Sequence, residues 1–152
     1  MSNKEFKQKV NEICNFIKTQ PKYDYVLTTD DDDLEYAYKC EAAFEMNLRS
    51  DYKALTTFFF DLSLAECYGK KVLSKTLAKI LNIYKNDIKS FAELILVLNH
   101  KSWLYDSVGA YSYAMMYSQL YYMVKELYFE WYEGKPKTKY NEAIDYYMKY
   151  ID

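Results

Sequence analysis

Glycine and proline are scarce in this chain, and their scarcity restricts the backbone that it can form. Only 3 Gly and 2 Pro occur among 152 residues, whereas glycine alone averages about 7% of the residues in proteins. Glycine permits tight turns and loops whose backbone approaches a phosphate group closely. The composition therefore favours long helices that are interrupted at few points.

Apolar residues recur with the 3.6-residue period of an α-helix along most of the sequence. A capping box of Ser2 and Glu5 predicts the start of the first helix, and Pro21 predicts its end. A second capping box, Ser90 with Glu93, predicts the start of another. The remaining helices are expected over residues 34–48, 50–68, 71–84, 110–132 and 139–151, and the span 34–68 could instead be one bent helix. The residues expected to face inward include Phe6, Val10, Ile13, Cys14, Ile17, Phe58, Phe59, Leu62, Ala65, Leu73, Leu77, Ile80, Leu81, Tyr84, Phe91, Leu94, Ile95, Leu98, Tyr105, Ala143, Ile144 and Tyr147.

These elements predict an all-α fold, a compact bundle of six or seven helices in a single domain over residues 1–152. Gly69, Gly109 and Gly134 follow three of the segments, where glycine commonly ends a helix. Charged residues interrupt every long apolar window, so no membrane span is expected. The cysteines lie on apolar helix faces and are expected to be reduced core residues, which indicates a cytoplasmic location. They are Cys14, Cys40 and Cys67.

Tyrosine is concentrated in the C-terminal third, where twelve of the nineteen lie between Tyr105 and Tyr150. One small core cannot easily supply partners for so many hydroxyl groups, so several tyrosines should lie at the surface. The segment 110–132 is apolar on nearly all sides and is expected to be the central helix of the bundle. Alternatively, part of it contacts a partner or a second copy of the chain. Tyr121, Tyr128 and Trp131 are its candidate partner-binding residues.

Charge is segregated along the chain. Residues 30–66 hold ten acids and three bases, a net charge of −7, and residues 67–101 hold seven bases and two acids, a net charge of +5. The acidic block can be a solvated loop before a helix, or a surface that docks on a basic groove of a nucleic-acid-binding protein. A calcium loop fits poorly, because the position that requires glycine is Glu35. The candidate partner-binding acids are Asp30, Asp31, Asp32, Asp33 and Glu35.

Motifs for catalysis and metal binding are lacking in the sequence. It has no phosphate loop, dinucleotide fingerprint or zinc spacing, and no sequence signature pairs His100, its single histidine, with a cysteine. We therefore expect no enzyme activity, no cofactor and no metal site. Lys71, Lys75 and Lys79 form a stripe along one helix, for which a solvated face is favoured over direct contact with nucleic acid.

Residues 92–152 resemble small helical proteins carried by bacteriophages and conjugative elements. The resemblance rests on Leu98-Asn99-His100-Lys101-Ser102-Trp103, on Tyr117-Ser118-Gln119-Leu120-Tyr121-Tyr122, on Asp145-Tyr146-Tyr147 and on the terminal Ile151-Asp152. It implies the context of a mobile element, in which small proteins often block a host machine, as anti-CRISPR proteins do. The sequence thus suggests a non-enzymatic inhibitor that occludes a host nucleic-acid-handling protein. The alternative is a self-associating structural or assembly module, a homo-oligomer.

Overall fold

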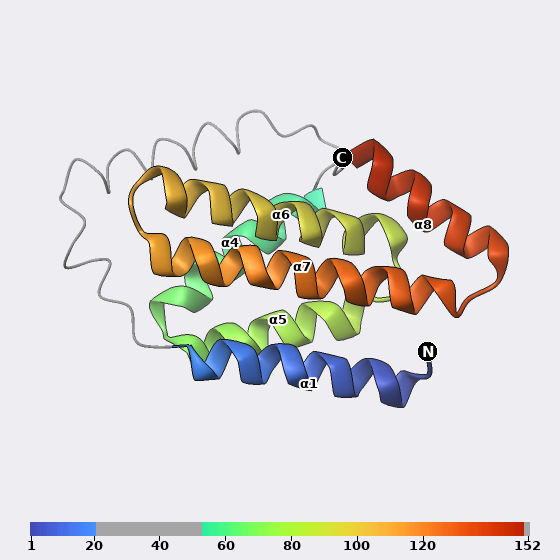
Figure 1. The fold of residues 1–152 in the computed structure, drawn as a ribbon, viewed down its shortest axis with the longest axis horizontal. Helices are drawn as coiled ribbons and strands as arrows, with labels where there is room; N and C mark the ends of the chain where they lie inside the picture. The colour runs from blue at the N-terminus through green and yellow to red at the C-terminus, as the bar shows by residue number, and fades with distance from the viewer. Residues whose placement is uncertain (21–52, 151–152) are drawn as a thin grey trace.

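A computed structural model describes residues 1–20 and 53–150, which form six α-helices and no strand (Figure 1). The predicted all-α bundle is confirmed. The helix expected over residues 34–48, Cys40, and the choice between one helix and two over residues 34–68 lie outside the described residues. The helices are α1 (Asn3–Thr19), α4 (Lys53–Cys67), α5 (Lys70–Tyr84), α6 (Ile88–Ser107), α7 (Tyr111–Glu133) and α8 (Lys137–Tyr150).

Local sequence signals set several of the helix ends. Ser2 is the N-cap of α1, and its hydroxyl oxygen accepts a hydrogen bond from the Glu5 amide at 3.1 Å. Gly69 separates α4 from α5 with a φ of +103°, and Gly109 follows α6 with a φ of +81°. Both angles lie in the region that favours glycine, so these two turns depend on the missing Cβ.

The predicted capping box at the start of α6 is wrong by one turn, because Asp87 is the N-cap. Its carboxylate accepts hydrogen bonds from the Ser90 amide at 3.2 Å and from the Ser90 hydroxyl at 3.0 Å. Ser90 and Glu93 lie inside the helix and are buried. Starting the helix at Ile88 places that apolar side chain in the core, which favours the earlier start.

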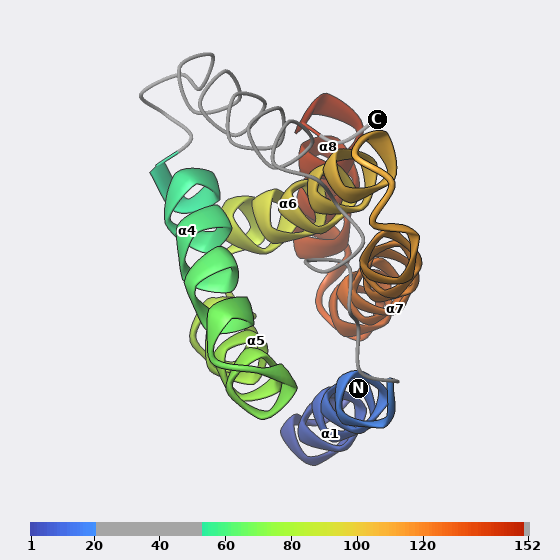
Figure 2. The same ribbon diagram turned by 90° about the vertical axis from the view of Figure 1, so that its left-hand side faces the viewer.

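Helix α6 lies at the centre of the bundle and contacts α4, α5, α7 and α8. Figure 2 shows α4 and α5 along one side of it, with α7 and α8 on the other and α1 between α5 and α7. The segment expected to be central, α7, lies beside α6 and also contacts α1 and α8. Within the described residues, α6 rather than α7 therefore joins the two sides of the bundle.

The residues predicted to face inward on α1, α4 and α6 are buried where their side chains are described, whereas Tyr84 on α5 and Ile144 and Tyr147 on α8 are only half-buried. Phe6, Val10 and Ile17 on α1 are buried, as are Phe91 and the other predicted residues of α6. The expectation of a buried Cys67 is wrong, because this residue ends α4 and its side chain is exposed. None of the described helices combines the length and the apolarity needed to cross a bilayer.

Candidate functional site

An apolar groove lies between α4 and α5. The two helices are antiparallel, and Phe58 near the start of α4 packs edge-on against Tyr84 at the end of α5, with ring centroids 4.9 Å apart. The groove has a volume of about 540 Å³. Its polar lining residues are Thr57, Asp61, Thr76 and Lys79, and its apolar lining residues are Phe58, Leu64, Ala65, Tyr68, Val72, Ile80, Ile83 and Tyr84.

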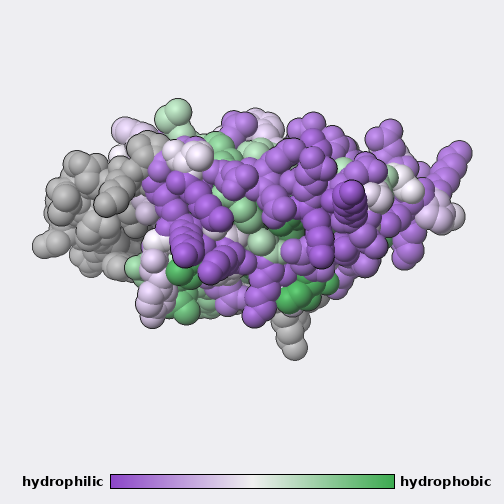
Figure 3. Space-filling view, turned by 90° about the horizontal axis from the view of Figure 1, so that it is seen from below, coloured by the Kyte–Doolittle hydropathy of each residue, from purple (hydrophilic) through white to green (hydrophobic). Residues whose placement is uncertain are grey.

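Large apolar side chains stand exposed on both walls of this groove. Leu64 is 61% exposed and Tyr68 71% exposed on α4, and Ile83 is 59% exposed on α5. Figure 3 looks from the side of α1 and α5, and it shows hydrophobic patches at its lower margin within a largely hydrophilic face. Contiguous exposed apolar surface beside a concavity is typical of a site that binds another protein.

A second exposed apolar patch lies at one end of the α6–α7 pair. It contains Trp103, Tyr111 and Met115, which are 57%, 64% and 73% exposed. They border a shallow depression of about 590 Å³ together with Asp106. Tryptophan, tyrosine and methionine are enriched at protein interfaces, so this patch is a second candidate contact surface.

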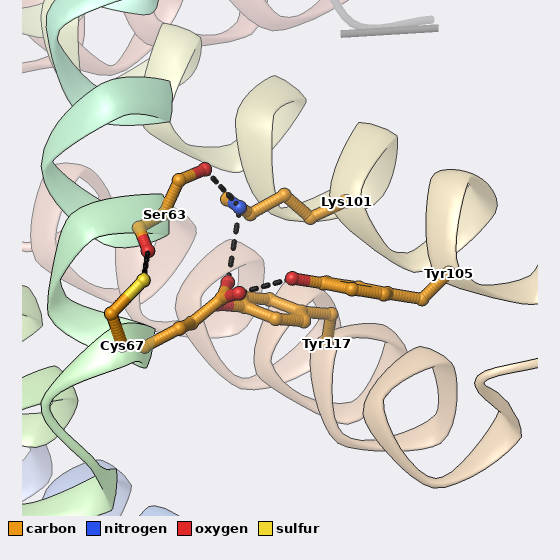
Figure 4. A network of polar contacts seen from close by, with 6 residues as sticks. Ser63, Cys67, Lys101, Tyr105 and Tyr117 are labelled. Carbon is orange, nitrogen blue, oxygen red and sulfur yellow. Dashed lines mark hydrogen bonds and ion pairs between the residues drawn. The ribbon is translucent and has the colours of Figure 1, made fainter. Parts of the chain in front are cut away.

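The interior holds a buried ion pair that joins α4 to α6 (Figure 4). The Lys101 side chain is 0% exposed, and its Nζ lies 3.0 Å from Oε1 of Glu66, whose side chain is 6% exposed. Nζ also donates to Oγ of Ser63 at 2.7 Å. The hydroxyls of Tyr105 on α6 and Tyr117 on α7 donate to the same Glu66 carboxylate.

Aromatic rings enclose the ammonium group of Lys101. Nζ lies 4.7 Å from the ring centroid of Phe59, 5.4 Å from that of Tyr117 and 5.7 Å from that of Tyr105. Cation–π attraction and the pairing with Glu66 together compensate the loss of hydration on burial. Because Lys101 and Glu66 are buried and hydrogen-bonded to residues of three helices, we assign this network to the connection of α4, α6 and α7.

His100 lies on α6, is half-buried and contacts two aromatic rings. Its ring centroid lies 5.8 Å from Phe59 and 5.8 Å from Trp103. Burial, with a smaller contribution from the adjacent Lys101 charge, lowers the pKa of His100 from 6.5 to about 4. The imidazole is therefore neutral at pH 7.

The predicted partner-binding residues that the structure describes are Tyr121, Tyr128 and Trp131, and they differ in burial. Tyr128 and Trp131 are buried, and the Tyr128 hydroxyl donates to the Ala143 carbonyl at 2.6 Å. Trp131 packs on Phe6 with ring centroids 4.9 Å apart. Buried side chains cannot anchor a partner, so we assign both to the core as a correction. Tyr121 is half-buried, with its hydroxyl 3.4 Å from that of Tyr147. The acids Asp30, Asp31, Asp32, Asp33 and Glu35 lie outside the described residues.

Sequence reasoning missed the exposed apolar residues of the groove and the buried Lys101. The spacing did carry a signal for Lys101, which lies three residues after Leu98 and four before Tyr105 on the inward face of α6. No comparable signal marks Leu64 and Ile83, since a leucine or isoleucine on a helix usually indicates a core position.

Metal ligands do not cluster in the part of the chain that the structure describes: no three His, Cys, Asp or Glu side chains there could hold an ion together. Comparisons of the chain with protein-family models, with curated proteins and with solved structures found no match.

Proposed function

We propose that this chain is a non-enzymatic protein-binding protein that acts by occluding a surface of its partner. The observation that carries the proposal is the groove between α4 and α5, where Leu64, Tyr68 and Ile83 are exposed around a concavity. Exposed apolar groups of this size are costly in water unless a partner covers them. A tyrosine on the rim adds a rigid anchor with one polar end.

The biological setting of the proposal comes from the C-terminal resemblance to proteins of mobile elements. In that setting the partner is a host protein, and a nucleic-acid-handling defence protein is the class that such inhibitors commonly block. The acidic segment that contains Asp30 to Asp33 would add electrostatic steering toward a basic surface of that protein.

Affinity capture from the native host, with a groove variant and a matched control, tests the proposal. Leu64→Arg places a charge in the groove at an exposed position. The control, Met148→Arg, places a charge outside the groove on α8, where Met148 is 55% exposed. We expect wild type and Met148→Arg to capture the same partner and Leu64→Arg to lose it. Equal capture by all three proteins would show that the groove does not bind the partner.

Self-association is a second candidate function, and the patch of Trp103, Tyr111 and Met115 favours it. A second copy could cover these residues through a symmetric contact. Light scattering at micromolar concentration should then show a defined oligomer that Met115→Arg converts to monomer. A wild-type chain that is monomeric in this range would contradict this candidate.

A further inference from the structure

The shallow depression between α6 and α7 lies beside the Gly109 turn, where the two helices are joined (Figure 1). The most buried of its lining residues have short side chains, Ser102 and Ala114. The Ser102 hydroxyl donates to the Ala114 carbonyl at 2.9 Å, which holds the two helices together at the floor. Larger side chains border this floor on both helices, so the hollow follows from small residues that lie between large ones.

Two aromatic rings on the rim leave much of their surface to solvent. Trp103 on α6 is 57% exposed, and Tyr111 on α7 is 64% exposed. Met115, which is 73% exposed, adds an apolar side chain to the same rim. The faces of indole and phenol rings carry partial negative charge and attract cations. The rim therefore offers aromatic surface on which a positively charged group can stack.

The charge of the depression is negative. Asp106 is the only charged residue among the described residues that line it. Asp106 is exposed, and its carboxylate forms no hydrogen bond or ion pair within residues 1–20 and 53–150. The C-terminal end of α6 and the N-terminal end of α7 meet here, and their dipoles oppose each other. Asp106 therefore sets the charge of the site, and an organic cation would complement both this charge and the aromatic rim.

We infer that the depression binds an arginine side chain of a partner protein, whose guanidinium pairs with Asp106 and stacks on Trp103 or Tyr111. A guanidinium is planar, donates two parallel hydrogen bonds to a carboxylate and stacks on aromatic faces. Its methylene arm would cover Met115. A methylated ammonium fits less well, because it is bound in aromatic cages and two rings beside a shallow depression do not enclose it. A different protein is the expected source, since this chain contains a single arginine, Arg49.

Selection of short random peptides on the intact protein tests the chemistry of the bound group. Excess double variant Trp103→Ser, Asp106→Asn in solution removes the peptides that bind elsewhere, and we expect the remaining peptides to contain arginine. The best peptide is then synthesised with lysine or with citrulline, the neutral isostere, in place of its arginine. Loss of the charge removes an exposed ion pair, a factor of about 1.5 to 5, and a cation–π contact, a factor of about 2 to 5, so the citrulline peptide should bind about 3- to 25-fold more weakly. The lysine peptide should bind more tightly than the citrulline peptide and more weakly than the arginine peptide.

A single substitution and its matched control locate the bound peptide. Asp106→Asn should weaken binding of the arginine peptide by a factor of about 1.5 to 5 and leave the citrulline peptide unchanged. Asp145→Asn, at an exposed acid on α8, should change neither. The chain has two tryptophans, so the peptide should shift the indole N–H signal of Trp103 in NMR spectra and leave that of the buried Trp131 in place. Circular dichroism checks that each variant is folded, and Asp106→Asn retains the test if the double variant does not fold.

Several results would overturn the inference. These are a library without binders, equal binding of the arginine peptide and its citrulline or lysine version, and binding that Asp106→Asn does not change. A wild-type dimer in light scattering that Met115→Arg dissociates would also overturn it, because a second copy would then cover the depression. The inference does not depend on the groove between α4 and α5, so Leu64→Arg should bind the arginine peptide as wild type does.

Discussion

Replacing Lys101 by methionine should destabilise the protein strongly, although the two side chains have similar length and aromatic rings surround the position. Lys101 is 0% exposed, and its partner Glu66 has a side chain that is 6% exposed. In Lys101→Met the Glu66 carboxylate stays buried and keeps the Tyr105 and Tyr117 hydroxyls as donors but loses its counter-charge. The Ser63 hydroxyl also loses a donor at 2.7 Å.

The magnitude follows from the burial of both charges. Removal of one member of a buried ion pair costs about 3–5 kcal/mol, because the remaining charge is desolvated without compensation. In a chain of this length, about 1 kcal/mol shifts the melting temperature by roughly 2–4 °C. The variant should therefore melt about 6–20 °C lower than wild type.

Urea unfolding followed by circular dichroism measures this loss, with Lys139→Met as the control. Lys139 pairs with Glu142 at 3.4 Å, but both side chains are more than half exposed, so its removal should change the free energy of unfolding by less than about 0.5 kcal/mol. The double variant Lys101→Met, Glu66→Met removes both charges and should be more stable than Lys101→Met alone. A Lys101→Met chain within about 1 kcal/mol of wild type, or additive effects in the double variant, would refute the reasoning.

Three further predictions test local features of the bundle. Because burial depresses the pKa of His100 to about 4, the unfolded chain binds its proton more readily, so this residue should lower the free energy of unfolding as pH falls from about 6.5 to 4. Comparison of wild type with His100→Phe over that range, and an NMR titration of the imidazole, measure the effect; a pKa near 6.5 would contradict it. Asp87→Ala removes the N-cap of α6 and should cost about 1 kcal/mol in urea unfolding, and an unchanged midpoint would show that the cap is dispensable. Gly69→Ala should cost about 1 kcal/mol through its φ of +103° alone, since an added Cβ would meet no atom within 4 Å. Gly134, whose φ is −77°, is unsuitable as a control because a Cβ added there would clash with the Met1 amino nitrogen. Lys137→Ala, an exposed position, serves as that control in the same thermal melts and should leave the melting temperature unchanged.

Features that depend on neighbours in the chain could be predicted from the sequence. The start of α1 at Ser2 and the turns at Gly69 and Gly109 follow from hydrogen bonds and backbone angles that involve only a few adjacent residues. The inward faces of α1 and α6 follow from the helical period. The start of α6 was misplaced because Ser90 and Asp87 are both good capping residues, and the burial of Ile88 favours the earlier one.

Features that depend on which helices meet were decided only by the tertiary structure. Lys101 pairs with Glu66, 35 residues away, because α6 packs against α4, and no local rule relates these two positions. Contacts of α7 with α1, α6 and α8 bury Tyr128 and Trp131, while Leu64 and Ile83 stay exposed. Tyrosine and leucine are compatible with either environment, so their residue type cannot decide it. The helical period predicts which residues share a face of a helix. Which other helix packs against that face depends on contacts between residues far apart in the sequence.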